Sequence, residues 1–164
     1  MYNNTKHAID FDAFSTHGVA SNNTAWDNAQ EALFIEQAAS YITVAGNVFG
    51  PGNYVGIAVY NNAIGTATQG HVIVGNTVFG SLDAGISVGS TAPRSGAEDV
   101  GVTVIGNTLY GNAGQGIHAN GGQTGTVYAG NADSDGMSHY AASALFAGNV
   151  TAFDPLDRVR VGPK

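Results

Sequence analysis

Three carboxyl side chains near the start of the sequence have the types and spacing that acid–base chemistry needs. Asp10 and Asp12 alternate along one short segment, and Glu36 ends a second segment of similar pattern. If these segments pair as strands, the carboxylates lie close together, and their repulsion raises the pKa of at least one of them. Carboxyl groups of unequal pKa suit cleavage of a glycosidic bond. We therefore predict Asp10, Asp12 and Glu36 as catalytic residues, with a solvated acidic edge as the alternative.

Later segments continue the same alternation and supply candidates for substrate contacts. An aromatic ring suits the apolar face of a sugar, and hydroxyl, imidazole and amide groups offer hydrogen bonds. Phe34 and Tyr128 are further aromatic candidates, although either would equally serve to cover a sheet. Tyr60 and His118 stand two repeats apart, roughly 10 Å by strand spacing, which is too far for a concerted acid–base pair. The predicted substrate-binding residues are Tyr60, Ser87, His118 and Asn120.

A separate group of oxygen-bearing side chains, Asn131, Asp133 and Asp135, precedes Gly136. Oxygen ligands at alternate positions before a glycine match the start of a calcium-binding loop. Ala142 stands where an EF-hand has its bidentate glutamate. We therefore predict a shortened calcium loop at Asn131, Asp133 and Asp135, with a plain acidic turn as the alternative. Three histidines share no metal-ligand spacing and are interpreted as surface or turn residues: His17, His71 and His139.

Two recurring motifs indicate what positions these side chains. The first ends in Gly-Asn and places asparagines at 47, 76, 107 and 131, at intervals of 24 to 31 residues. A looser copy ends at Asn22, and a doubtful one ends at Asn149. The second motif reads Gly-Ile-x-Val in its clearest copies and keeps step with the first. Two motifs in step indicate a solenoid whose coils each contain both. The extra residues at 65–70 and 91–99 are rich in Gly, Ser and Thr and are interpreted as loops.

Both motifs alternate apolar residues with small or polar ones, which is the periodicity of β-strands. We predict an all-β fold, a right-handed parallel β-helix of about five coils. The asparagines then occupy one turn position and hydrogen-bond along the stack. The alternative, a β-sandwich of short hairpins, does not predict an asparagine that recurs at one register. Two columns are expected to face inward: Ile9, Leu33, Ile57, Ile86 and Ile117, and beside them Phe11, Ile35, Val59, Val88 and Ala119.

The pattern Val-x-Gly-Asn followed by Gly-Ile-x-Val, around Asn47, Asn76 and Asn107, resembles the parallel β-helix repeats of the pectate-lyase-like superfamily. The segment 16–29 is similar to coils of mannuronan epimerases and polysaccharide lyases. The resemblance covers residues 7–131 and concerns coil packing rather than a catalytic motif. It implies a carbohydrate-active protein with its polysaccharide along an outward-facing sheet. An enzyme of this kind would be a polysaccharide hydrolase, lyase or epimerase. No Lys or Arg falls in the outward columns to neutralise a substrate carboxylate.

Length and charge exclude several classes of function. The 164 residues suit one domain, with a repeat core at 7–131 and a last coil or cap at 132–164. The formal net charge of −7 argues against a nucleic-acid partner and an anionic membrane surface. The absence of cysteine excludes disulfides and cysteine-ligated zinc. No transmembrane run and no signal peptide are recognisable in the sequence.

Two functions of different class remain open at this point. One is an extracellular or cell-surface protein that binds, cleaves or modifies a polysaccharide, with calcium as its only expected cofactor. The other is a non-catalytic structural module of a fibre, spike or filament. Such a module would assemble through its open coil ends, as a homo-oligomer or as part of a longer chain.

Overall fold

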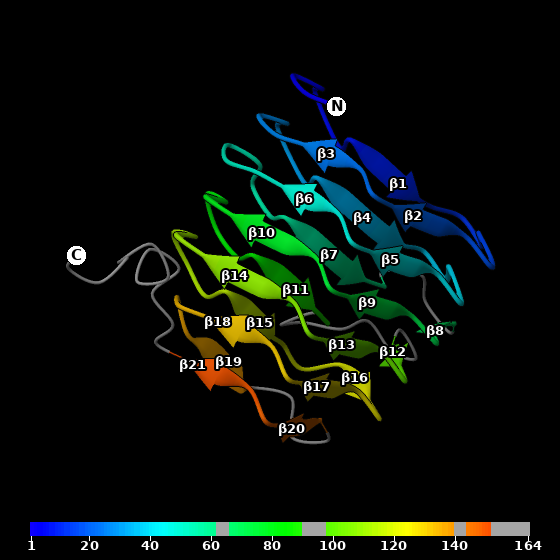
Figure 1. Ribbon diagram of the computed structural model, residues 1–164. Helices are drawn as coiled ribbons and strands as arrows, with labels where there is room; N and C mark the ends of the chain where they lie inside the picture. Colours follow the sequence, from blue (N-terminus) through cyan, green and yellow to red (C-terminus); the bar gives the residue numbers. More distant parts are fainter. Residues whose placement is uncertain (62–65, 90–97, 140–143, 152–164) are drawn as a thin grey trace.

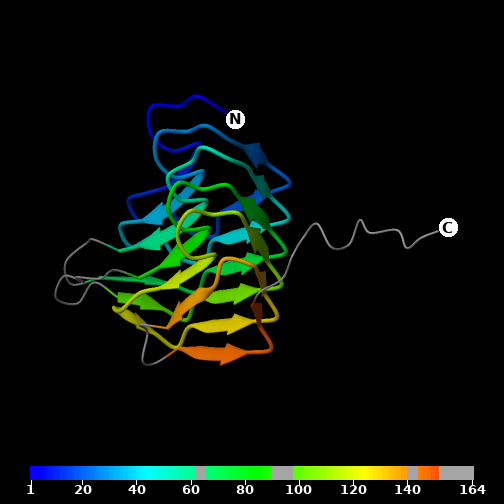
Figure 2. The same ribbon diagram turned by 90° about the vertical axis from the view of Figure 1, so that its left-hand side faces the viewer.

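The computed structural model describes residues 1–61, 66–89, 98–139 and 144–151 and shows a parallel β-helix (Figure 1). Strands of two to four residues alternate with tight turns, and every pairing between the described strands is parallel. The coils are stacked one below another from the N-terminus downward (Figure 2). No helix able to span a membrane occurs among the described residues.

Each coil contributes one strand to each of three six-stranded sheets, named here by their first strands. The β1 sheet contains β1 (Ile9–Phe11), β4 (Leu33–Glu36), β7 (Ile57–Tyr60), β11 (Ile86–Val88), β15 (Ile117–Ala119) and β19 (Met137–His139). The β2 sheet contains β2 (Val19–Ser21), β5 (Thr43–Ala45), β9 (Val72–Val74), β13 (Thr103–Ile105), β17 (Val127–Ala129) and β20 (Leu145–Ala147). The β3 sheet contains β3 (Thr24–Ala25), β6 (Val48–Phe49), β10 (Thr77–Phe79), β14 (Thr108–Tyr110), β18 (Ala132–Asp133) and β21 (Val150–Thr151).

The register of the β1 sheet confirms the two predicted inward columns. Ile9 pairs with Leu33, and the same row continues through Ile57, Ile86 and Ile117. From the second coil onward, both columns are fully buried, whereas Ile9 and Phe11 on the first coil are only partly covered. Alternation along each strand therefore presents the neighbouring residues outward, as the sequence pattern predicts.

A column of asparagine side chains runs through the turn between the β2 and β3 sheets. The side-chain amide of Asn47 donates to Oδ1 of Asn76 at 2.9 Å, and that of Asn76 donates to Oδ1 of Asn107 at 2.9 Å. The column continues through Asn131 to Asn149, so the doubtful last copy of the motif is a genuine coil. With it, the described part of the chain contains six coils rather than about five.

The first copy of this motif is one residue later than expected. Asn23, not Asn22, donates its side-chain amide to Oδ1 of Asn47 at 3.0 Å. Asn22 instead takes the place of Gly46 of the next coil, with φ of 56° beside 63° for the glycine. Asparagine tolerates this left-handed conformation, so the pair Asn-Asn replaces Gly-Asn.

The two insertions interpreted as loops contain strands where the structure describes them. A short sheet consists of β8 (Ala67–Gln69), β12 (Glu98–Val100) and β16 (Gln123–Thr124). Residue 65 and residues 91–97 lie outside the described residues. Thr68 and Asp99 point into the protein and are buried. Because these inward positions are polar rather than apolar, the composition of the two segments is that of loops.

Two further interpretations from the sequence need correction: Tyr128 as a sugar-stacking or sheet-covering residue, and His71 as a surface residue, although His71 does lie in the turn between β8 and β9. Tyr128 is fully buried in the row of Val104 and donates its hydroxyl to Gln123 at 2.9 Å, so it cannot contact a sugar. His71 is also fully buried, and its Nδ1 accepts the backbone N–H of Ile42 at 3.2 Å. Burial lowers the pKa of His71 to about 4. His17 is exposed as expected, and the side chain of His139 lies outside the described residues.

Candidate functional site

The outer face of the β1 sheet carries the predicted site residues in rows across the strands. Asp10 pairs with Phe34, which pairs with Ala58, and the row continues through Ser87 to His118. In the adjacent row, Glu36 pairs with Tyr60. Because the strands are parallel and in register, residues far apart in the sequence share one surface.

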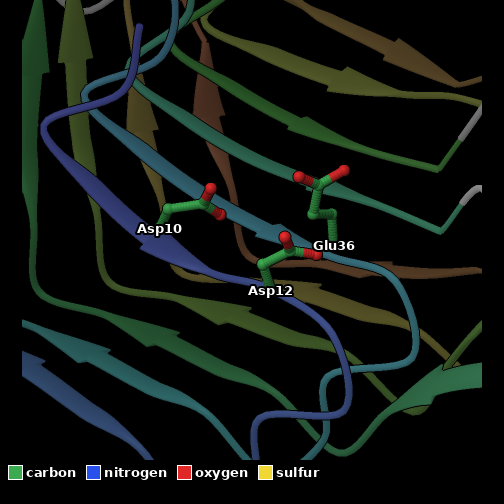
Figure 3. Close-up of side chains that lie close together, drawn as sticks. All are labelled: Asp10, Asp12 and Glu36. Atoms are coloured by element: carbon green, nitrogen blue, oxygen red, sulfur yellow. The ribbon is translucent and has the colours of Figure 1, made fainter.

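The three predicted catalytic carboxylates lie together at the N-terminal end of this face (Figure 3). One carboxylate oxygen from each of Asp10, Asp12 and Glu36 lies within 4.8 Å of the others. Partial burial raises the pKa of Asp10 and of Glu36, and the charge of Asp12 raises both further, while His7 acts in the opposite direction. Asp10 and Glu36 therefore hold a proton more strongly than free carboxyl groups, and the spacing of the cluster also suits a hard divalent cation.

A hollow of about 350 Å³ lies next to these carboxylates on the same face. We call it the groove. Its lining includes all four residues predicted to bind substrate: Tyr60, Ser87, His118 and Asn120. Small residues in the two rows produce the hollow, because Ala58, Ser87 and Gly89 fill less space than their neighbours.

Aromatic and amide side chains at the edges of the groove are fixed in place. Phe34 packs outward against Val55, Ala58 and Ala84 rather than into the main core. Asn120 is largely buried and donates its side-chain amide to the hydroxyl of Ser87 at 3.2 Å. The groove is therefore lined by side chains held in fixed positions, aromatic on one side and polar on the other.

Three lining residues come from the turns before the strands, and the sequence reasoning did not find them: Glu31, Tyr54 and Asp83. Tyr54 and Asp83 each precede the isoleucine of the second motif by three residues, Ile57 and Ile86. The backbone N–H of Asp83 donates to the carbonyl oxygen of Tyr54 at 2.9 Å, so the two residues stack on successive coils. Extending the columns three residues upstream would have shown this row.

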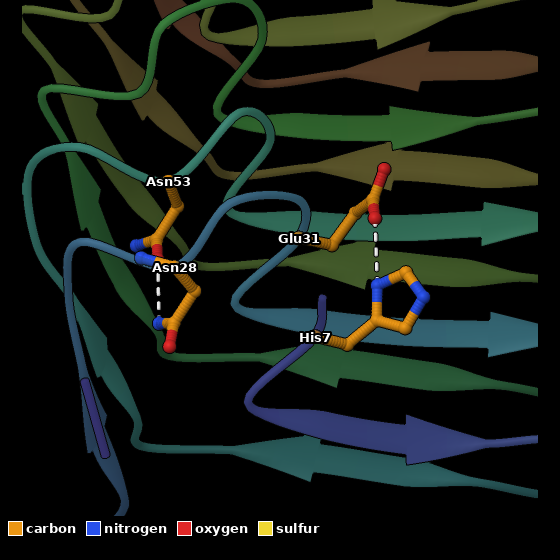
Figure 4. Close-up of polar contacts among 4 residues, drawn as sticks. All are labelled: His7, Asn28, Glu31 and Asn53. Atoms are coloured by element: carbon orange, nitrogen blue, oxygen red, sulfur yellow. Dashed lines mark hydrogen bonds and ion pairs between the residues drawn. The ribbon is translucent and has the colours of Figure 1, made fainter. Parts of the chain in front are cut away.

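Glu31 differs from Asp83 because a histidine holds it. Nδ1 of His7 lies 2.8 Å from Oε2 of Glu31 (Figure 4). The imidazole ring of His7 also lies against Phe34, with ring centroids 4.9 Å apart. Glu31 is therefore paired with His7, whereas Asp83 forms no ion pair within the described residues.

A second polar column runs through the turn that precedes the β1 sheet. Asn28 donates its side-chain amide to Oδ1 of Asn53 at 2.8 Å, as Figure 4 shows, and Asn4 donates to Asn28 in the same way. Later in this column, Asn112 donates to Asp135 at 2.8 Å. The column stabilises the turns that carry Tyr54 and Asp83 into the lining of the groove.

The structure separates the three residues of the predicted calcium loop by role. Asn131 belongs to the first asparagine column, and Asp135 ends the second one. Asp133 is fully buried in the row of Leu109 and accepts backbone N–H groups of Ile117, Asp135 and Gly136. Calcium binding stays a prediction, which a melting temperature in calcium and in chelator would test.

Asp99 is an additional buried carboxyl group that the sequence reasoning missed. It lies between Thr68 and Gln123 in the short sheet, and among the described residues its Oδ1 has no hydrogen-bond partner. Burial raises its pKa to about 8, against a smaller opposite effect of a backbone hydrogen bond at Gly89. Asp99 does not line the groove, so we assign it to the stability of the coil.

Comparison with known proteins identifies a related fold and no family. No family model matches the chain, and no curated protein sequence matches it. Among solved structures, the mannuronan C-5 epimerase AlgE6 A-module of Azotobacter vinelandii is similar, with a TM-score of 0.47 and 16% sequence identity. The match covers 93% of this chain and 56% of that one, so the chain spans about half the length of the epimerase module. At this level of identity the similarity concerns the fold alone.

Proposed function

We propose that this protein binds a carbohydrate chain in the groove on the outer face of the β1 sheet. The observation that carries the proposal is the composition of one hollow. It brings aromatic rings of Phe34, Tyr54 and Tyr60 together with hydrogen-bonding groups of Ser87 and His118. Sugars present an apolar ring face and a rim of hydroxyl groups, so a binding site needs both kinds of surface.

The shape of the groove supports an extended ligand. It crosses four neighbouring strands, β4, β7, β11 and β15, which at about 4.8 Å apart span about 14 Å. Residues of one row stand in register across these strands, so the lining side chains follow one another along the row. A short oligosaccharide lying across the strands would contact aromatic rings on one side and polar groups on the other.

Binding is tested with two tyrosines of equal exposure. Tyr54 lines the groove and is 50% exposed, while Tyr41 lies outside it and is 49% exposed. We expect Tyr54→Ala to weaken binding of oligosaccharides about tenfold, the equivalent of about 1.4 kcal/mol, and Tyr41→Ala to leave it unchanged. Affinity electrophoresis against immobilised polysaccharides would measure both. Equal affinity of the two variants would refute the placement of the sugar.

Cleavage of the bound chain is the second candidate function, and the position of the carboxylates favours it. Asp10 and Glu36 pair in register with Phe34 and Tyr60 of the groove. One oxygen from each of the three carboxylates lies within 4.8 Å of the others, so two carboxyl groups can reach the same glycosidic bond. In a retaining reaction, Asp10 or Glu36 would protonate the glycosidic oxygen as its bond to the anomeric carbon breaks, and Asp12 would form an ester with that carbon. Water, deprotonated by the first carboxylate, would then hydrolyse the ester and free Asp12.

Release of reducing ends from polysaccharides would test this second function. Asp12→Asn and Glu36→Gln should each abolish turnover, with circular dichroism unchanged. A suitable control is Asp27→Asn, because Asp27 is an exposed acidic residue outside both the groove and the carboxylate cluster. Full activity in both cluster variants would exclude cleavage and leave binding as the function.

A further inference from the structure

Acidic side chains outnumber basic ones around the groove, where Lys6 and His7 oppose the negative charge near Asp10. Glu31 and Asp83 line the groove, and the carboxylates of Asp10, Asp12 and Glu36 lie next to it on the same face. No Lys or Arg side chain is among the described residues that line the groove. A ligand that enters this groove therefore meets a negative potential, in keeping with the net charge of −7 for the whole chain.

Asp83 is the carboxylate best placed to meet a ligand. It is half-buried, it lines the groove, and it has no ion-pair partner within the part of the chain that the structure describes. At its position on the next coil stands Gly114, whose backbone N–H donates to the carbonyl oxygen of Asp83. A Cβ atom at Gly114 would lie 2.9 Å from Oδ1 of Asp83, so the glycine leaves space beside that oxygen on the side of the next coil.

The residue on the other side of Asp83 in the stack is Tyr54. The two are adjacent on successive coils, and the tyrosine side chain is 50% exposed. A carboxylate beside an aromatic ring is a favourable setting for an ammonium group, which gains a charge-assisted hydrogen bond and a cation–π contact. Neither group is arranged to receive a sugar carboxylate, which Asp83 would repel.

We infer that the carbohydrate taken up by this groove is an amino sugar polymer, with a free ammonium group bound by Asp83 in the hollow that Tyr54 also lines. The inference rests on the proposed function and adds the class of sugar. The carboxylate cluster agrees with it, because burial and mutual repulsion raise the pKa of Asp10 and Glu36, and a bound cation would relieve that repulsion. A polyuronate would add negative charge to the same face.

A panel of three hexasaccharides separates the inference from the proposed function. The probes are a glucosamine hexamer, its fully N-acetylated counterpart and an oligouronate, titrated calorimetrically below the pKa of the sugar amine. We expect the glucosamine hexamer to bind at least tenfold more tightly than the acetylated one, and the oligouronate not to bind. The acetylated probe has the same backbone without the charge, so the ratio isolates the ammonium contact.

Variants then assign the contact to its residue. Asp83→Asn should remove the preference for the glucosamine hexamer and keep the affinity for the acetylated one. Asp27→Asn lowers the negative charge of the protein by the same amount outside the groove and should keep the preference. An equal loss in both variants would reduce the effect to net charge and overturn the assignment to Asp83.

The remaining outcomes are distinct. Equal binding of the free and acetylated hexamers would overturn the amino sugar and leave the carbohydrate groove intact. Preferential binding of the oligouronate would overturn it as well. No binding of any hexamer would refute the proposed function itself.

Discussion

Replacing Asn76 by alanine tests how much the asparagine column contributes to stability. The side chain of Asn76 is 1% exposed and makes four hydrogen bonds. Its amide nitrogen donates to the carbonyl oxygen of Val44 at 3.0 Å and to Oδ1 of Asn107 at 2.9 Å. Its Oδ1 accepts the backbone N–H of Asn47 at 3.0 Å and the side-chain amide of Asn47 at 2.9 Å.

The expected cost follows from which groups lose their partner. Oδ1 of Asn107 keeps a donor, the backbone N–H of residue 76, at 2.9 Å. The backbone N–H and one side-chain N–H of Asn47 lose their acceptor inside the protein. A buried polar group without a partner costs about 1–3 kcal/mol, so we expect Asn76→Ala to lower the free energy of unfolding by about 4 kcal/mol.

Asn23→Ala is the matched control, because it makes the same substitution at the first position of the column. Asn23 donates to the carbonyl oxygen of Ser21 and to Oδ1 of Asn47, and Oδ1 of Asn47 keeps the backbone N–H of residue 23 when the side chain is removed. The loss should be about 1 kcal/mol. Urea unfolding followed by circular dichroism would measure both variants. Equal losses, or a loss below about 1 kcal/mol for Asn76→Ala, would refute the reasoning.

Three further outcomes concern buried polar groups in the short sheet or next to it: Asp99, His71 and Tyr128. The pKa of Asp99 is raised to about 8, so its contribution to stability is complete below pH 3.8 and is lost as the pH rises through about 8. Between pH 6.5 and 8 the free energy of unfolding should fall by about 2 kcal/mol in the wild type and stay level in Asp99→Asn; the same slope in both would exclude Asp99 as its source. The pKa of His71 is lowered to about 4, so stability that depends on its neutral form is lost as the pH falls from 6.5 to about 4. Unfolding midpoints of His71→Gln over that range should lack this loss. Tyr128→Phe should cost about 1 kcal/mol through the lost hydrogen bond to Gln123, and an unchanged unfolding midpoint would show that this bond is not net stabilising.

The inward columns and the asparagine column could be predicted because they repeat with the coil. Strand alternation assigns Ile57 and Val59 to the inside and Ala58 to the outside, and one correct strand places its neighbours on every coil. The same periodicity placed Asp10 and Glu36 on the outer face. These features depend on whether a residue occupies an odd or an even position along its strand, which a single sequence shows directly.

The parts that could not be predicted lie outside the strands or at their ends, where the alternation of inward and outward residues stops. Tyr54 and Asp83 stand in turns, where side-chain direction depends on backbone conformation rather than alternation. Asn22 and Asn23 are identical in type, and only the positive φ of Asn22 shows which one replaces the glycine. Tyr128 illustrates a different reason: its aromatic ring was predicted to stack on a sugar or cover a sheet, whereas it lies inside the solenoid with its hydroxyl bonded to Gln123.

The asparagine column fixes the register between successive coils but not the number of residues in each coil. Successive members are separated by 29, 31, 24 and 18 residues from Asn47 to Asn149, yet their side-chain hydrogen bonds all measure 2.8–3.0 Å. Insertions and deletions are therefore absorbed away from this corner, for example in the short sheet of β8, β12 and β16. A protein of this design can acquire segments of new length and chemistry beside its groove during evolution, while the interior of every coil keeps its register.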